Sequence, residues 1–284
     1  MKNATELTSI IELEQLEDNL FRGQNYQAPW GRVFGGQVLA QSIHAARRTV
    51  PVDRLVHSMH GYFILGGDIR QPIIYHVDRI RDGRSFTTRR VVAIQKGKPI
   101  FNMSASFQVI EEGFVHQISM PNVPPPDTIA TDQEWASQFK ESHPELYKMY
   151  QMDRPIEFRP IERSNPLNPQ KSRPFRHVWI RAKGRLPDLR QVHQEVLAYA
   201  SDYNLMTTSL FPHRGSFDRK KMQLASLDHA MWFHHNFRAD DWLLYAIDSP
   251  SASNSRGFNR GSFFNLEGKL VASVVQEGLI RNRG

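Results

Sequence analysis

The chain has 284 residues, with 36 Lys and Arg against 29 Asp and Glu and a formal net charge of +7. Its 40% hydrophobic and 23% charged residues are typical of a globular chain and exclude a disordered or fibrous one, and the length allows one large or two small domains. The absence of cysteine excludes disulfides, thiolate metal ligands and a cysteine nucleophile. Because the basic residues are scattered, we do not expect nucleic acid as a partner; a small phosphorylated ligand fits better.

The N-terminus does not have the pattern of a signal peptide. Apolar residues recur every three or four positions from Leu7 to Leu20, which predicts an amphipathic helix, and acidic residues interrupt them. No run of about 18 apolar residues predicts a membrane span. The chain ends in Arg283-Gly284 and not in a peroxisomal Ser-Lys-Leu signal, so we expect a cytoplasmic protein.

The first half predicts one helix followed by antiparallel strands. The helix begins at Gly35-Gly36, and strands are expected at 73–80, 85–95 and 99–109, separated by Gly-containing turns. A proline run then begins a connection that spans about 120–175. Within it, Thr131 and Glu134 form a capping box for a helix expected to run to about Tyr150.

The second half repeats the first approximately. The alignable segments are 37–40 with 195–198, 57–63 with 227–233, 75–78 with 245–248, 84–86 with 256–258, and 106–108 with 274–276. Each half therefore predicts a helix covering one face of an antiparallel sheet. We expect an α+β fold of two tandem units forming a pseudo-dimer, with residues 1–119 and 176–284 as the units and 120–175 as the linker.

Three polar residues of the second half are candidates for chemistry. Gln276 ends an apolar strand and shares a face with Leu270, Ala272 and Val274. A buried amide without partners costs about 1–3 kcal/mol, so Gln276 indicates a polar partner. Asp202 flanks the apolar stripe of the second helix, and Ser226 lies in a predicted strand.

Each candidate also has a simpler interpretation. Asp202 is then a solvated helix carboxylate, Ser226 a hydroxyl bonded to backbone, and Gln276 a strand-end residue that reaches solvent. Asp228 and His229 are adjacent, so alternation along a strand separates their side chains. The chain has no His-Glu-x-x-His motif and no Gly-x-Ser-x-Gly motif, which argues against a metal site and a serine nucleophile.

From about residue 13 to 283 the sequence resembles the bacterial acyl-CoA thioesterase II family. The resemblance rests on seven ordered motifs, Leu20-Phe21-Arg22-Gly23, Val33-Phe34-Gly35-Gly36-Gln37, Arg81-Asp82-Gly83-Arg84-Ser85-Phe86, Tyr199-Ala200-Ser201-Asp202, Asp228-His229-Ala230-Met231-Trp232-Phe233-His234, Ser255-Arg256-Gly257-Phe258 and Val275-Gln276-Glu277-Gly278. It implies a double hotdog fold, cleavage of fatty acyl-CoA to fatty acid and CoA in lipid metabolism, no cofactor and no metal. It also implies a homo-oligomer, a dimer or tetramer.

The family holds its hydrolytic water with an Asp, a Thr or Ser, and a Gln. By motif match these are Asp202, Ser226 and Gln276, with Ser where the best-known bacterial members have Thr. The resemblance implies that this water attacks the thioester directly. For the oxyanion, backbone N–H groups at a helix N-terminus are expected, as at Gly36.

CoA carries three phosphates, which suggests a role for the basic surplus. Arg256 and Arg260 flank Gly257, where the backbone can approach a pyrophosphate, and Arg84 holds the place equivalent to Arg256 in the first half. Surface arginines without a ligand are the simpler interpretation.

Two alternatives stay open. A hotdog enoyl-CoA hydratase pairs an Asp on the helix with a nearby His, and residues 203–207 after Asp202 contain no His. A protein that binds acyl-CoA without turnover is the other alternative. Thiol release from a panel of acyl-CoA esters distinguishes them.

Overall fold

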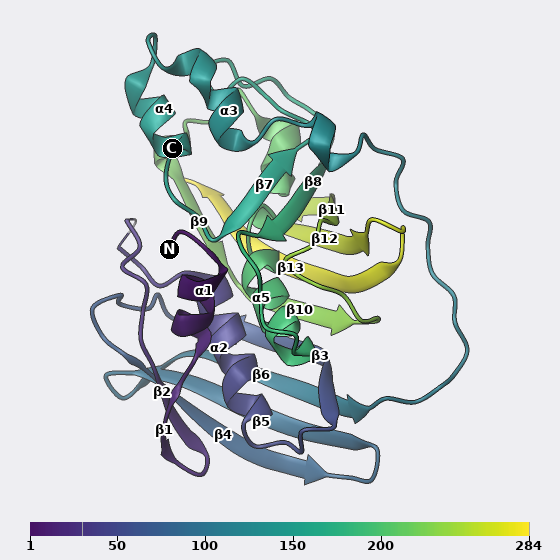
Figure 1. Ribbon diagram of the computed structural model, residues 1–284. Helices are drawn as coiled ribbons and strands as arrows, with labels where there is room; N and C mark the ends of the chain where they lie inside the picture. The colour runs from purple at the N-terminus through teal and green to yellow at the C-terminus, as the bar shows by residue number, and fades with distance from the viewer. Residues whose placement is uncertain (30, 284) are drawn as a thin grey trace.

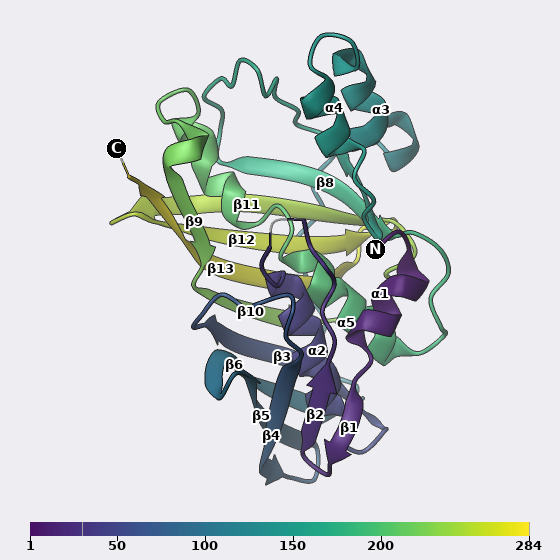
Figure 2. The same ribbon diagram turned by 90° about the vertical axis from the view of Figure 1, so that its left-hand side faces the viewer.

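Strands from both halves of the chain join in one continuous sheet. In the computed structural model, which describes residues 1–29 and 31–283, this sheet is antiparallel and 13-stranded, with the order β1-β2-β4-β5-β6-β3-β10-β13-β12-β11-β8-β7 and with β9 paired to β13 (Figures 1 and 2). The N-terminal half comprises α1 (Ala4–Ile11), β1 (Glu14–Glu17), β2 (Leu20–Gly23), α2 (Gly35–Arg47), β3 (Arg54–Phe63), β4 (Ile73–Asp82), β5 (Phe86–Gln95) and β6 (Lys98–Val109).

The C-terminal half repeats the helix and the four long strands. It comprises β8 (Phe175–Ala182), α5 (Arg190–Ser201), η3 (Met206–His213), η4 (Arg219–Lys221), β9 (Met222–Ser226), β10 (Asp228–Phe233), β11 (Leu243–Ser253), β12 (Arg256–Asn265) and β13 (Leu270–Asn282). Between the halves lie η1 (Pro126–Thr128), α3 (Asp132–Ala136), η2 (Ser137–Phe139), α4 (Pro144–Tyr150) and β7 (Ile156–Pro160). The expected α+β double hotdog is confirmed, since the sheet wraps around one helix in each half.

Two predicted helices outside the repeat need correction, namely the N-terminal helix and the helix in the linker. The N-terminal helix ends at Ile11, and the apolar residues beyond it form the β1–β2 hairpin, which pairs with β4. Leu16 is exposed in β1, so the helical spacing there did not mark a buried face. The helix expected from Thr131 to Tyr150 ends at Ala136 and passes into η2. A new helix starts at Pro144, a first helical position where the missing N–H of proline costs no hydrogen bond.

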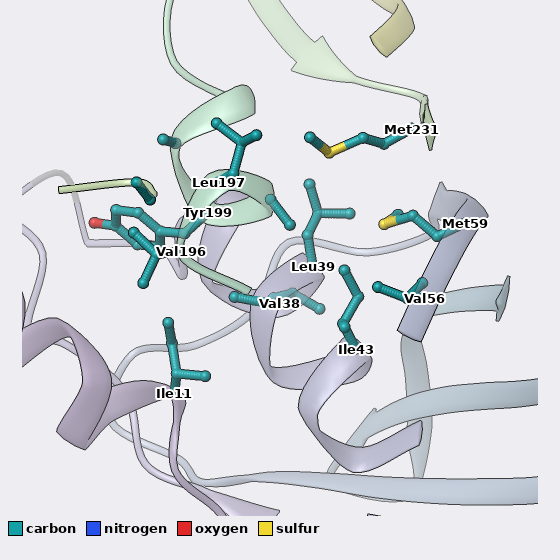
Figure 3. Close-up of a cluster of buried hydrophobic side chains, with 14 of the residues drawn as sticks. Ile11, Val38, Leu39, Ile43, Val56, Met59, Val196, Leu197, Tyr199 and Met231 are labelled. Carbon is teal, nitrogen blue, oxygen red and sulfur yellow. The ribbon is translucent and has the colours of Figure 1, made fainter. Parts of the chain in front are cut away.

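The two central helices, α2 and α5, pack side by side inside the curved sheet (Figure 1). Their contact is built from aliphatic side chains such as Leu39 and Ile43 of α2 and Leu197 of α5, with Met59 and Met231 of the sheet packed close by (Figure 3). All five are at most about 1% exposed. Burial of each such side chain is worth about 1.5–3 kcal/mol, so this cluster fixes the position of the helices on which the site is built.

The sequence repeat corresponds to a two-fold arrangement of the halves. At the β3–β10 junction, His60 pairs with Ala230, which is its own counterpart in the repeat. Ser58 pairs with Trp232, the counterpart of Tyr62. A pseudo-dyad through the junction requires that counterparts pair symmetrically about one central position, and these residues do. The pseudo-dimer expected from the repeat is therefore present in the fold.

The strand register corrects one segment of the repeat alignment. Counting along β6 and β13 from the strand pairs next to the β3–β10 junction, the counterpart of Gln276 is Ala105. The alignment that set Gln276 against Gln108 is therefore wrong. The turn before β13 is longer than the turn before β6. Because the two halves share few identical residues, the match of one glutamine with another concealed this difference in turn length.

Candidate active site

Asp202 is held where the two central helices meet. It forms the C-cap of α5, and its Oδ2 accepts a hydrogen bond of 2.9 Å from the backbone N–H of Gly36 in the first turn of α2. Its Oδ1 accepts one of 3.0 Å from Gln276 Nε2 of β13. The helix ends at Ser201, so Asp202 lies at the helix terminus and not, as expected, on the flank of a continuing helix.

The glycine at position 36 is required by this helix contact. A Cβ atom there would lie 2.2 Å from the backbone oxygen of Tyr199 in α5, far inside van der Waals contact. The two helices therefore approach closely enough for the α2 N-terminus to reach Asp202. The positive end of the α2 dipole at this position also favours a negatively charged group.

Gln276 is fully buried on the inner face of β13. Its Nε2 donates to Asp202 and, over 3.1 Å, to His229 Nδ1. Its Oε1 has no hydrogen-bond partner among the described residues. Directly opposite on β12, Asn259 is also fully buried with an unpaired Oδ1. A buried acceptor without a protein donor is a position that a water or a polar substrate group can satisfy, and this sheet face has two of them.

His229 is the site residue that the sequence analysis missed. Its Nδ1 accepts from Gln276, so its Nε2 carries the proton and donates to Ser201 Oγ over 2.9 Å, and Ser201 in turn donates to Ala198 O. Complete burial lowers the pKa of His229 to about 3, which keeps the ring neutral. The chain of hydrogen bonds holds the Gln276 amide with its nitrogen toward Asp202.

The prediction that Asp228 and His229 do not form a dyad is confirmed. Asp228 Oδ1 accepts from the backbone N–H of Glu277, whereas His229 contacts Gln276. Correct strand register was the signal that could have found His229, because it places His229 opposite Gln276 on the next strand.

Ser226 ends β9 and lies opposite Gly278 of β13. Since Gly278 follows Gln276 by two residues, Ser226 lies on the same sheet face as Gln276 and diagonal to it, at about 7–8 Å between backbones. In the described part of the chain, its hydroxyl makes no hydrogen bond to Asp202 or Gln276. The structure thus brings Asp202 and Gln276 into contact and leaves the Ser226 hydroxyl uncommitted beside them.

The surroundings of Asp202 are largely aromatic. Phe34 packs against Tyr199 at 5.1 Å and Tyr203 at 4.5 Å between ring centroids, and Phe63 lies against Gly35 next to the carboxylate. Burial raises the pKa of Asp202 above its ordinary 3.8, and the hydrogen bonds from Gln276 and Gly36 partly offset this. A carboxylate with a raised pKa is a better proton acceptor than an exposed one.

The arginines expected at the CoA phosphates are Arg256 and Arg260 of β12, together with Arg84. Arg256 and Arg260 alternate with buried Asn259 on β12, so they extend from the face of the sheet opposite Gln276. Arg256 pairs with Glu277 at 2.9 Å, and Gly257 is packed so tightly that a Cβ would lie 2.3 Å from Ser209 Oγ of η3. The glycine therefore serves close packing of η3 on the sheet.

Arg260 belongs to a pair that the fold uses twice. It bonds Asp248 at 2.5 Å and 3.1 Å, and in the N-terminal half Arg90 bonds Asp78 at 2.8 Å. The strand register makes these two pairs counterparts. Arg84 is exposed in the β4–β5 turn, and the same register makes Phe86, and not Arg84, the counterpart of Arg256.

The repeated pair predicts a structural role for Arg260. Arg260→Ala should lower the free energy of unfolding by no more than about 1 kcal/mol, because the pair is half exposed. KM should change equally for an acyl-CoA and for the acyl-pantetheine that lacks the nucleotide. Steady-state kinetics on both substrates check this, with Arg90→Ala as the matched control. A selective rise in KM for acyl-CoA would place a phosphate at Arg260.

Among the residues that the structure describes, no three His, Asp or Glu side chains are grouped so that they could hold a metal ion. In the same part of the chain, no helix has the length and apolar character needed to cross a membrane.

Comparison with known proteins places the chain in a class, the hotdog thioesterases. The family model described as acyl-CoA thioesterase matches residues 146–279, and the acyl-CoA thioesterase N-terminal domain matches residues 26–108. The chain is 40% identical over 276 residues to acyl-CoA thioesterase 2 of Haemophilus influenzae, covering 97% of this chain and 96% of that protein. It is 40% identical to human acyl-coenzyme A thioesterase 8, covering 97% and 88%.

Solved structures agree. Acyl-CoA thioesterase II of Mycobacterium marinum superposes with a TM-score of 0.80 at 42% identity, covering 97% of this chain and 98% of that one. A hotdog-fold protein from Alicyclobacillus acidocaldarius gives a TM-score of 0.75 at 17% identity, over 97% and 98% of the two chains, which shows the shared fold alone. The chain belongs to the acyl-CoA thioesterase family and is a thioester hydrolase.

Proposed function

We propose that this protein hydrolyses fatty acyl-CoA by direct attack of a water held by Asp202, Ser226 and Gln276. The observation that carries the proposal is the contact of a half-buried carboxylate with a fully buried amide whose oxygen has no partner among the described residues. Asp202 is the general base, and Gln276 Oε1 and the Ser226 hydroxyl position the water. A water fixed by several groups attacks more readily than a mobile one, because its orientation is already set.

In the reaction, the water oxygen bonds to the thioester carbonyl carbon and Asp202 takes one water proton. The C–S bond then breaks, the fatty acid is released, and the proton passes to the CoA thiolate. Asp202 is thereby returned to its charged form. Thiol release from acyl-CoA, measured with a chromogenic thiol reagent, tests the activity, and no release from any acyl chain length would contradict it.

The Asp202 pKa predicts the acid side of the pH profile. Only the deprotonated carboxylate accepts a proton, so kcat/KM should fall as pH decreases through a pKa that lies above 3.8. Loss of the Gln276 hydrogen bond, which lowers this pKa, should move the midpoint of residual activity in Gln276→Leu to higher pH. Kinetics across the acid range check both statements. A midpoint that stays in place in Gln276→Leu would separate Asp202 from the titration.

The hydratase alternative gains a histidine from the fold but loses support from its geometry. His229 lies in the site, yet both of its ring nitrogens are engaged, with Gln276 and Ser201, and its pKa of about 3 makes it a weak base. Incubation with an enoyl-CoA, with hydration followed by the loss of absorbance of the conjugated thioester, distinguishes the two reactions. The non-catalytic alternative predicts binding of acyl-CoA without thiol release.

We further propose a homo-oligomer, a cytoplasmic location and a role in fatty acid metabolism. Exposed apolar side chains at Phe114, Val115 and Ile118 are typical of an association surface, which supports a dimer or tetramer. Light scattering on the purified protein tests the assembly, and fractionation of expressing cells tests the location. We also propose the domain boundaries 1–119, 120–175 and 176–284, with 120–175 as the linker. Limited proteolysis tests them.

A further inference from the structure

Two segments of the C-terminal half form a strongly basic surface. Residues 169–176 and 211–221 hold seven Lys and Arg and a single acidic residue. The two segments lie side by side, because the backbone N–H of Ser172 donates to Phe211 O at 3.0 Å. The seven residues, called the basic surface below, are Lys171, Arg173, Arg176, Arg214, Arg219, Lys220 and Lys221. Since the whole chain has a formal net charge of +7, these short segments hold most of its positive surplus.

The charges of the basic surface are not neutralised within the protein. In the part of the chain that the structure describes, none of its seven residues forms an ion pair. Asp132 and Glu162 are the acidic residues whose charge acts on Arg176. They are paired instead with Arg163 at 3.1 Å and with His177 at 2.6 Å. Unpaired cations that lie close together repel one another, and a bound anion removes this repulsion.

The innermost cation of the basic surface is Arg176. It lies on the same face of β8 as the core residues Val178 and Ile180. Its Nη1 donates to Asn204 Oδ1 at 2.9 Å. Burial and the charge of Arg214 lower the pKa of Arg176 to about 10, which leaves the guanidinium charged at neutral pH. A fixed positive charge is therefore present at the inner end of the basic surface.

The ring of Phe211 orders two of the guanidinium groups. Arg214 lies 3.7 Å and Arg176 lies 5.2 Å from the ring centroid, and Phe211 itself is buried. A cation–π contact holds a guanidinium group in place and leaves N–H groups for other acceptors. Because ordered guanidinium groups lose less freedom on binding, they suit the two-point contact that they make with phosphate oxygens.

The outer part of the basic surface lies on η4. Arg219, Lys220 and Lys221 are all exposed there. The turn that carries them is capped by Asp218, whose side chain accepts from the backbone N–H of Lys220 at 2.9 Å. Exposed cations on an ordered turn attract an anionic ligand from solution and raise its local concentration.

The basic surface is connected to the proposed active site at both of its ends. At the outer end, β9 begins directly after Lys221 and ends at Ser226, and Figure 2 shows this strand leading into the sheet. At about 3.3 Å per residue, five strand residues span about 17 Å. At the inner end, Asn204, which bonds Arg176, follows Asp202 by two residues. An extended pantetheine arm separates a thioester from the CoA diphosphate by a distance similar to the length of β9.

We propose that the basic surface binds the phosphate groups of the CoA moiety. The inference rests on the proposed function, which places the thioester at Asp202 and Ser226. Arg214 and Arg219 provide guanidinium groups for the phosphate oxygens, and Lys220 and Lys221 add the positive field that attracts them. The positive surplus of the chain thus acts from η4 and the start of β8.

Steady-state kinetics on an acyl-CoA and on the matching acyl-pantetheine, which lacks the phosphates, test the inference. In the double variant Arg219→Gln with Lys220→Gln, KM for acyl-CoA should rise about tenfold, because charge-assisted contacts to phosphate are lost. KM for acyl-pantetheine and both kcat values should stay unchanged. The matched control is Lys98→Gln with Arg190→Gln, two exposed cations outside the basic surface, which should change neither KM. An equal rise for both substrates would place the phosphates elsewhere.

Calorimetry with CoA separates this inference from the proposed hydrolysis. CoA that binds the double variant about tenfold more weakly than the unaltered protein supports the basic surface, even if no thioester is cleaved. The adenosine bisphosphate part of CoA should compete better than inorganic phosphate, and equal competition would show a general anion surface and overturn the inference. Thiol release with an unchanged KM for acyl-CoA in the double variant would also overturn it and leave the hydrolysis standing.

Discussion

Replacing Asp202 with Asn should lower kcat about 10²–10⁴-fold, because the amide has the size of the carboxylate but cannot accept the water proton. Its oxygen can still accept from Gly36, so the helix contact persists and the protein stays folded. Thiol release under saturating acyl-CoA measures the loss, and circular dichroism confirms the fold. Asp228→Asn is the matched control, since Asp228 is a nearby carboxylate that accepts from the backbone N–H of Glu277 and does not contact Gln276 in the described part of the chain. It should keep a rate close to the unaltered protein.

Because the three site residues are proposed to hold one water, we expect that they do not act independently. If Asp202, Ser226 and Gln276 serve one water, Asp202→Asn combined with Gln276→Leu should lose little more than Asp202→Asn alone. Ser226→Ala added to either should follow the same rule. Losses that multiply in the double variants would mean that the three residues act on separate steps.

Gly36→Ala should be the most damaging small substitution in the chain. The added Cβ would lie 2.2 Å from Tyr199 O, a backbone atom that cannot rotate away, so α2 must move from α5. Overpacking of this kind costs about 1–3 kcal/mol, and the displaced Gly36 N–H also releases Asp202. We expect a lower free energy of unfolding together with a lower kcat, measured by urea denaturation and thiol release.

The matched control is Gly113→Ala, where a Cβ would meet nothing within 4 Å and the backbone is not left-handed. It should stay within about 0.5 kcal/mol of the unaltered protein. A folded Gly36→Ala protein with full activity would contradict the account of the α2–α5 contact.

The fold could be predicted because its periodic patterns and its repeat agree. Alternation placed Gln276 on an inner strand face, and the repeat placed one helix in each half, which the structure confirms. The sequence could not set the strand register, because the match of Gln276 with Gln108 lies only three residues from the true match with Ala105. The register alone identifies Ala105 as the counterpart.

The site shows the same limit. Asp202 and Gln276 were singled out from sequence and do contact each other, but His229 was missed because its partner lies on another strand. The ion pair of Arg260 with Asp248 could not be predicted either, because Asp248 is twelve residues away in sequence and directly opposite in the sheet. Contacts between strands decide both cases, and a linear pattern does not contain them.

The central claim is that water attacks the thioester directly, and a single turnover in ¹⁸O-labelled water tests it. With enzyme in excess over acyl-CoA, mass spectrometry of the fatty acid and of the peptide that contains Asp202 follows the label. The account predicts one ¹⁸O atom in the fatty acid carboxylate and none in Asp202. Label in the Asp202 carboxylate, with unlabelled fatty acid after the first turnover, would show an acyl-enzyme anhydride and contradict it.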